Sequence, residues 1–246
     1  MKLTSYKLTI KTDRPLETQA VRLRGFIGKR FPELNLLHNH MSDSSFIYTF
    51  PRVQYHVINS NMMIIGIEEG VDAVKHIETV LSELSLNKET YLIVEKTGIE
   101  REIYYGILKD QISYSFLTPW LALNQKNYEK YQMMVTWAKR KKLLEGILVG
   151  NIISMSKSLG YTVPGPIEAK IERMREVRTS LKGTAMIGFL GTFSVNFEIP
   201  DYWGIGKSVS RGFGTVVRQG TDGRGKKEDK DPIELPHINI KTDNVW

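Results

Sequence analysis

The chain has 246 residues, of which 41% are hydrophobic and 25% are charged, as expected for a soluble globular protein of one large or two small domains. It contains no cysteine, which excludes disulfide bonds, zinc fingers and thiol catalysis. The formal charge is +7 at pH 7, which favours an acidic partner and a nucleic acid first of all.

The beginning of the sequence, MKLTSYKLTIKT, alternates apolar and polar residues and lacks the apolar run of a signal peptide. No segment approaches the roughly 18 consecutive apolar residues that a membrane-spanning helix needs. We therefore expect a cytoplasmic protein without a membrane partner.

The first half of the chain predicts the element order β-α-β-β-α-β. Alternating apolar residues predict strands at 2–11, 46–50, 53–59, 62–67 and 90–96, and helical spacing of apolar residues predicts helices at 17–31 and 69–85. This is the order of elements in the ferredoxin-like fold.

The second half predicts the same order again. Strands are expected at 112–123, 167–178, 183–199 and 214–220, and a helical segment at 126–160 is expected to break into two helices at Gly146 and Gly150. The last helix of the pattern is short and lies inside or beside a glycine-rich loop. We therefore expect an α+β protein of two tandem ferredoxin-like (RRM-like) domains, β-α-β-β-α-β twice, at residues 1–100 and 101–220. The polar segment 221–246 is expected to be a flexible tail.

The glycine-rich segment GIGKSVSRGFG, residues 204–214, raises the question of which phosphate it binds. A nucleotide-binding P-loop requires a glycine where this chain has Asp201, and a dinucleotide-binding loop requires a different glycine spacing. Two readings remain: a turn that joins two strands, or a loop whose backbone N–H groups approach the phosphates of an RNA. In the second reading the RNA-binding residues are Gly204, Gly206, Lys207, Ser208, Ser210, Arg211, Gly212 and Gly214.

A histidine pair, His38 and His40, forms the second group of interest. In an extended backbone both side chains point to the same side. The pair could bind a metal together with Asp43, could transfer protons during RNA cleavage, or could be two exposed histidines without a function. For RNA cleavage, Lys29, Arg30 or Arg52 could stabilise the negative charge and Tyr48 could orient or donate a proton.

Further basic residues are candidates for RNA contacts. Arg173, Arg175 and Arg178 lie in a predicted β-hairpin that could read bases of an RNA stem. The four consecutive cations Lys139 to Lys142 would spread around all faces of a helix, so a solvated surface is favoured there over an RNA contact.

Taken together, these motifs resemble a known family. GIGKSVSRGFG before the last strand resembles the C-terminal glycine-rich loop of the CRISPR-associated repeat-RNA endoribonucleases, the sixth Cas family. The segments LRGFIGKRFPELNLLHNH, FPRVQYHVIN and IIGIEEG resemble a subtype-I-B-like branch of it. The resemblance extends over residues 1–220.

This resemblance implies two ferredoxin-like domains and an enzyme that cuts CRISPR precursor transcripts within each repeat. Cleavage would proceed by attack of the 2′-OH, without metal or other cofactor, and would leave 2′,3′-cyclic phosphate and 5′-OH ends. The implied catalytic residues are His40, His38, Tyr48 and Lys29, with His40 favoured.

Partners would be the repeat RNA, subunits of a CRISPR effector complex and a second copy of the chain. The alternatives are a non-catalytic RNA-binding subunit with the same fold and a metal-dependent phosphohydrolase, which EDTA would inhibit.

Overall fold

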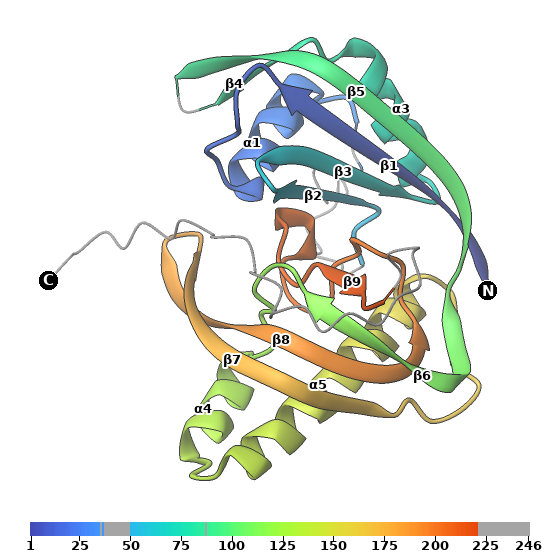
Figure 1. Cartoon of the computed structure of the whole chain (residues 1–246), viewed down its shortest axis with the longest axis vertical. Helices are drawn as coiled ribbons and strands as arrows, with labels where there is room; N and C mark the ends of the chain where they lie inside the picture. The colour runs from blue at the N-terminus through green and yellow to red at the C-terminus, as the bar shows by residue number, and fades with distance from the viewer. Residues whose placement is uncertain (35, 37–49, 87, 221–246) are drawn as a thin grey trace, which may run out of the picture.

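The computed structural model describes residues 1–34, 36, 50–86 and 88–220, which form two α+β halves (Figure 1). The strand predicted at 46–50, apart from its last residue, and the tail predicted at 221–246 therefore lie outside the described residues. Within the described residues, no helix is both long and apolar enough to cross a membrane.

The first half forms a five-stranded antiparallel sheet with the strand order β2-β3-β1-β5-β4. Without β4 at its edge, this is the strand order of a ferredoxin-like domain, as the sequence predicted. The elements are β1 (Lys2–Thr12), α1 (Ala20–Arg30), β2 (Val53–Ile58), β3 (Asn61–Ile67), α3 (Gly70–Val80), β4 (Glu83–Leu86) and β5 (Glu89–Tyr104).

The helix predicted at 69–85 is shorter than expected, because its last part is the separate strand β4. The helix ends at Val80, which is 45% exposed, and Leu81 has an extended backbone. Leu84 and Leu86 are buried and alternate with exposed residues, which is the two-residue period of a strand. Leu84 also fits the helical spacing of the residues before it, so the sequence pattern did not mark the boundary.

The two faces of strand β3 pack in two different hydrophobic cores. Met62 and Ile64 belong to the core that the sheet forms with α1 and α3. Met63, Ile65 and Ile67 point to the other side and belong to a core that also contains residues of the second half. The two halves therefore share this second core, and strand β3 is buried on both faces.

The second half has the strand order β7-β8-β6-β9, which again is the ferredoxin-like order. The short 3₁₀ helix η1 lies in the glycine-rich loop, where the sequence predicted a short last helix. The elements are β6 (Gly106–Phe116), α4 (Gln125–Met133), α5 (Trp137–Ser158), β7 (Ala169–Leu181), β8 (Thr184–Glu198), η1 (Val209–Arg211) and β9 (Val216–Arg218).

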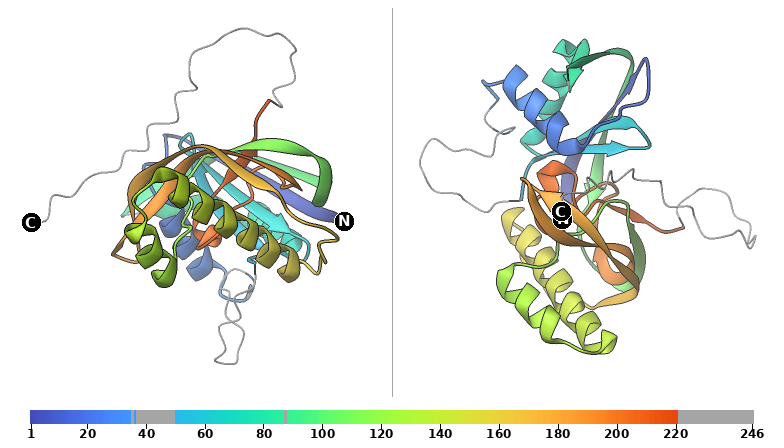
Figure 2. Two further views of the ribbon diagram at one scale, coloured as in Figure 1. Left: turned by 90° about the horizontal axis from the view of Figure 1, so that it is seen from below. Right: turned by 90° about the vertical axis from the view of Figure 1, so that its left-hand side faces the viewer.

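The prediction of two helices in 126–160 is confirmed, but the predicted position of the break is wrong. The helices are interrupted at Met134 to Thr136, because Met134 and Thr136 have extended backbones. Helix α5 continues through Gly146 and Gly150, because its buried stripe of Leu144, Leu148 and Ile152 holds it against the core. Figure 2 shows α4 and α5 on the outside of the second half.

Candidate functional site

The glycine-rich loop lies between the two halves of the molecule (Figure 1). Its backbone N–H groups are already used by the protein: that of Gly204 donates to Gln54 Oε1 at 2.9 Å and that of Gly214 to the Pro119 carbonyl at 3.0 Å. The N–H of Gly212 donates to the Val209 carbonyl at 3.0 Å. The expectation that these glycine N–H groups are available to a phosphate is therefore not met.

Close packing explains the glycines instead. A Cβ atom on Gly212 would lie 2.6 Å from Cβ of Ala20 in α1 and 2.9 Å from the carbonyl oxygen of Tyr55 in β2. A Cβ atom on Gly206 would lie 2.6 Å from Nε1 of Trp120. Because real Cβ atoms do not approach neighbours so closely, these positions admit only glycine, and the loop can wedge between the halves.

The side chains of the loop differ in their access to solvent. Lys207 is exposed, Ser208 and Arg211 are half-buried, and Ser210 is buried. A contact of this loop with a phosphate would therefore use the side chains of Lys207, Ser208 and Arg211 rather than the N–H groups of Gly204, Gly212 and Gly214.

Arg24 in α1 adds a second guanidinium group beside the loop, and it is not among the residues that the sequence predicted to bind RNA. It lies one helical turn after Ala20, the residue that packs on Gly212. Burial, and then the nearby charge of Arg211, lower the pKa of Arg24. Two like charges held together are stabilised by an anion, so Arg24 and Arg211 are suited to a phosphate. In the sequence, Arg24 is one of several cations of the helix predicted at 17–31. Its position near Arg211 depends on the tertiary fold, which the sequence pattern does not show.

His56 connects the loop to the first half and is unsuited to proton transfer. Its Nδ1 lies 2.9 Å from the hydroxyl oxygen of Thr215, and the side chain is completely buried. The Thr215 hydroxyl donates to the Gly212 carbonyl at 3.4 Å, which leaves the ring N–H of His56 as the donor to Thr215. Burial lowers the pKa of His56 to about 3, so the ring stays neutral at physiological pH.

Three of the four predicted catalytic residues, His38, His40 and Tyr48, lie outside the described residues. The fourth, Lys29, is exposed in the last turn of α1, next to the exposed Arg30. These assignments stay predictions.

The chain after this segment is fixed to the second half. The N–H of Phe50 donates to the Ser158 hydroxyl at 2.7 Å, and the Arg52 guanidinium donates to the Ser158 carbonyl at 2.9 Å. Arg52 also forms an ion pair with Glu69 at 2.6 Å. Arg52, considered above as a catalytic cation, thus has structural partners that anchor this part of the chain to the end of α5.

The predicted RNA-binding arginines of β7 are exposed but separate from the loop. Arg173 and Arg175 lie on the strand at one edge of the second sheet, while β9, which follows the glycine-rich loop, forms the opposite edge. A register shift between Ile171 and Arg173 buries Ile171 and leaves Arg173 paired with Thr192. The two predicted RNA-binding regions are therefore not brought together.

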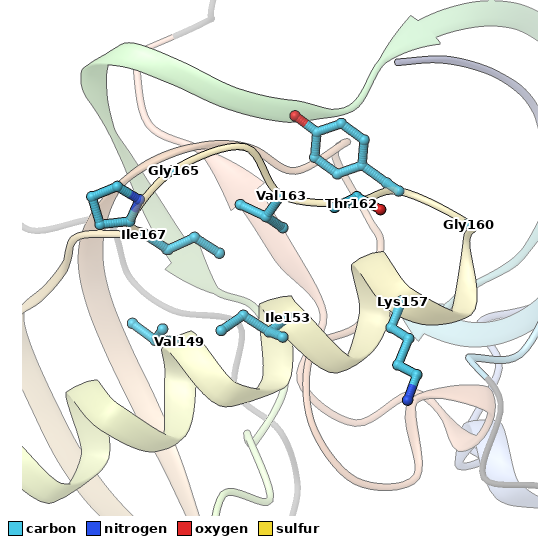
Figure 3. Close-up of a pocket in the computed structure, with 10 residues that line it drawn as sticks. Val149, Ile153, Lys157, Gly160, Thr162, Val163, Gly165 and Ile167 are labelled. Atoms are coloured by element: carbon cyan, nitrogen blue, oxygen red, sulfur yellow. The ribbon is translucent and has the colours of Figure 1, made fainter.

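Two cavities border α5, and the larger one lacks catalytic groups. Its volume is about 670 Å³, and aliphatic side chains of α5 and of the 160–167 segment, such as Ile153 and Val163, face each other across it (Figure 3). Lys157 is the charged residue of its lining. The smaller cavity, of about 440 Å³, is more polar and lies between α5 and residues 122–127.

Comparisons with known proteins cover both halves. A family model described as the Cas6b N-terminal domain matches residues 1–103, and one described as the Cas6b C-terminal domain matches residues 106–219. An uncharacterized protein from Methanocaldococcus jannaschii is 45% identical over 138 residues, which are 56% of this chain and 93% of that protein.

Solved structures agree with the family models. A crystal structure of Cas6b matches with a TM-score of 0.82 and 37% identity, over 89% of this chain and 100% of that chain. A crystal structure of the CRISPR RNA processing endoribonuclease Cas6b matches with a TM-score of 0.71 and 34% identity, over the same shares of the two chains. Because both halves and the full length of these solved chains are matched, this chain belongs to the Cas6b family of CRISPR RNA processing endoribonucleases.

Proposed function

We propose that this enzyme cuts CRISPR precursor transcripts within each repeat by metal-independent transesterification. A base removes the proton of the 2′-OH next to the scissile phosphate, and the freed oxygen attacks the phosphorus. An acid protonates the leaving 5′-oxygen, so the products carry a 2′,3′-cyclic phosphate and a 5′-OH. The observation that carries the proposal is the pair His38 and His40 in a chain whose two halves both match Cas6b.

The proposed roles follow from the chemistry of the side chains. His40 and His38 exchange protons with the 2′-oxygen and the 5′-oxygen, since an imidazole titrates near neutral pH. Lys29 stabilises the negative charge that develops on the phosphorane, and Tyr48 orients the reacting group or donates to it. His56 does not compete for these roles, because it is buried and neutral.

RNA binding is assigned to the cations at the junction of the two halves. Arg24, Lys207 and Arg211 come from α1 and from the glycine-rich loop. The exposed Arg173 and Arg175 of β7 add a separate contact. The RNA is the CRISPR repeat, the reaction takes place in the cytoplasm, and effector-complex subunits or a second copy of the chain are proposed as further partners.

The catalytic assignment is tested by cleavage of a CRISPR repeat RNA from the source genome in the presence of EDTA. Wild type is expected to cut, and His40→Ala is expected to cut on the order of 10² times more slowly or less, while binding the RNA with nearly unchanged affinity. Loss of wild-type activity in EDTA would contradict the metal-independent mechanism. Full activity of His40→Ala would contradict the role of His40.

The binding assignment is tested by the salt dependence of RNA affinity. Lys207→Ala and Arg211→Ala are each expected to weaken binding and to reduce the slope of log K against log salt by about 0.7 to 0.9. Lys88→Ala is the control, because Lys88 is an exposed cation in the β4–β5 turn of the first half. Equal affinity of all three variants would show that the loop does not contact RNA.

A further inference from the structure

Helix α5 borders an open cavity that the proposed function does not use. It has a volume of about 440 Å³ and lies between α5 and the segment that leads into α4. We call it the α5 groove. It is lined by Asn124 and Asn127 on one side and by Lys142, Gly146, Gly150 and Asn151 of α5 on the other.

The polar groups of the α5 groove are mainly donors. Oδ1 of Asn124 accepts from the N–H of Asn127 at 2.8 Å, and Oδ1 of Asn151 accepts from Trp120 Nε1 at 3.1 Å. Among the described residues, the side-chain nitrogens of Asn124, Asn127 and Lys142 form no hydrogen bond or ion pair. Such a set of N–H donors suits a ligand rich in acceptors, such as phosphate oxygens and base carbonyl groups.

The glycines of α5 leave the groove open. Lys142, Gly146 and Gly150 are spaced by four residues and therefore share one face of the helix. A Cβ atom on either glycine would meet no atom within 4 Å, so packing within the described structure does not require glycine there. Glycine in the middle of a helix lowers helix stability. Larger side chains would fit the fold but would fill the groove next to its donors.

The α5 groove lies next to the glycine-rich loop. The N–H of Lys207 donates to the carbonyl of Leu121 at 3.3 Å, directly before the groove residue Ala122. A Cβ atom on Gly206 would lie 3.1 Å from Oδ1 of Asn151, which lines the groove. The loop and the groove lining therefore meet at Leu121 and Asn151, so one RNA strand can be tested for contact with both.

The surroundings of the groove are strongly basic. Lys126, Lys130, Lys139 and Lys142 are exposed, and no acid of the described residues lies within 4.0 Å of their ammonium groups. The charge matches a polyanion, and the open shape and the amide donors match a single strand whose bases are accessible.

We propose that the α5 groove binds a single-stranded segment of the same RNA that the glycine-rich loop contacts. The proposal rests on the assignment of that loop to RNA binding. It gives the enzyme a second contact outside the cleavage site, in which Lys142 binds phosphate and the asparagine amides bind base edges.

The test measures affinity for a fluorescent CRISPR repeat RNA from the source genome in four variants. Gly146→Leu/Gly150→Leu fills the groove, and its affinity is expected to fall on the order of tenfold because the amides and Lys142 lose access to the RNA, while its Tm stays the same or rises. Lys142→Ala is expected to reduce the salt slope by about 0.7. Lys157→Ala is the matched control, because it removes an exposed cation of the same helix outside the groove. Lys207→Ala tests whether the glycine-rich loop contacts the RNA.

The outcomes separate the two proposals. Weaker binding by Lys207→Ala together with unchanged binding by the glycine and Lys142 variants would overturn the groove and keep the loop. Unchanged binding by all variants would overturn both. A protein occupant of the groove would also leave affinity for purified RNA unchanged, and would therefore count against the proposal.

A second measurement locates the RNA directly. The chain has no cysteine, so Asn127→Cys creates a single attachment point for a photoactivatable crosslinker. Crosslinking of the repeat RNA from this position, but not from Lys157→Cys, is expected. Equal crosslinking from both positions would overturn the groove as a specific site.

Discussion

At the scale of single residues, His56 is fixed in a neutral form by its position between the two halves. It is buried in β2, donates to Thr215 and has a pKa of about 3 because of burial. In the unfolded chain its pKa is near 6.5. As the pH falls below 6.5, the unfolded chain therefore binds a proton that the folded protein excludes, and stability decreases.

The resulting pH dependence is measurable. Between pH 7.5 and pH 5.0, His56 is expected to reduce the free energy of unfolding by about 2 kcal/mol, since each pH unit below 6.5 contributes about 1.4 kcal/mol. Urea unfolding of wild type and of His56→Asn at both pH values measures it, with the difference between the proteins assigned to the ring. A wild type that loses no more stability than His56→Asn would contradict the buried neutral histidine.

At the scale of elements, the glycine-rich loop is a packing element first, and its glycines serve the contact between the halves. Gly212 has a φ of +83° and packs on Ala20 and Tyr55, while Gly183 in the β7–β8 turn has a φ of +80° and no neighbour within 4 Å. The two positions share the left-handed backbone and differ in packing. They form a matched pair for measuring what the packing contributes.

Substitution of these glycines by alanine is expected to separate the two effects. Gly183→Ala should cost about 1 kcal/mol for the left-handed backbone, and Gly212→Ala should cost about 2 to 4 kcal/mol because the loop must also move from α1 and β2. Chemical denaturation of both variants measures the difference. Equal losses would show that the loop tolerates a side chain at Gly212.

The sequence predicted the type and order of most elements because their apolar residues follow the period of a strand or a helix. It did not separate β4 from α3, since Leu84 fits both periods, and it placed the helix break at glycines that α5 in fact contains. It recognised the glycine-rich loop but not the reason for its glycines, which are contacts with Ala20, Tyr55 and Trp120. Long-range contacts of this kind, including the approach of Arg24 to Arg211, leave no local pattern.

At the scale of the whole molecule, the two halves are held together by a common core. Leu3, Met63, Ile65 and Ile67 of the first half belong to the same cluster as Tyr105 and Trp203 and the buried stripe of α5. Neither half covers this cluster alone. We therefore expect the protein to unfold as one cooperative unit.

The positions of the tryptophans allow a direct test, because Trp120, Trp137, Trp203 and Trp246 all lie in the second part of the sequence. Ile64→Ala removes a buried side chain of the first half's own core and should cost about 2 to 5 kcal/mol. Cooperative unfolding requires that tryptophan fluorescence and far-UV circular dichroism shift to the same lower urea midpoint. The exposed Leu92→Ala serves as the control. A fluorescence midpoint that stays at the wild-type value would show independent halves.

The common core also limits how such enzymes can recombine. Met63, Ile65 and Ile67 of β3 belong to the same core as Trp203 and Ile205, which lie more than a hundred residues later in the sequence. A crossover near residue 105 between this gene and that of a distant relative would join two intact folds with mismatched inner surfaces. We therefore expect the two halves to diverge as a pair, with a change in one half tolerated where the other half compensates for it.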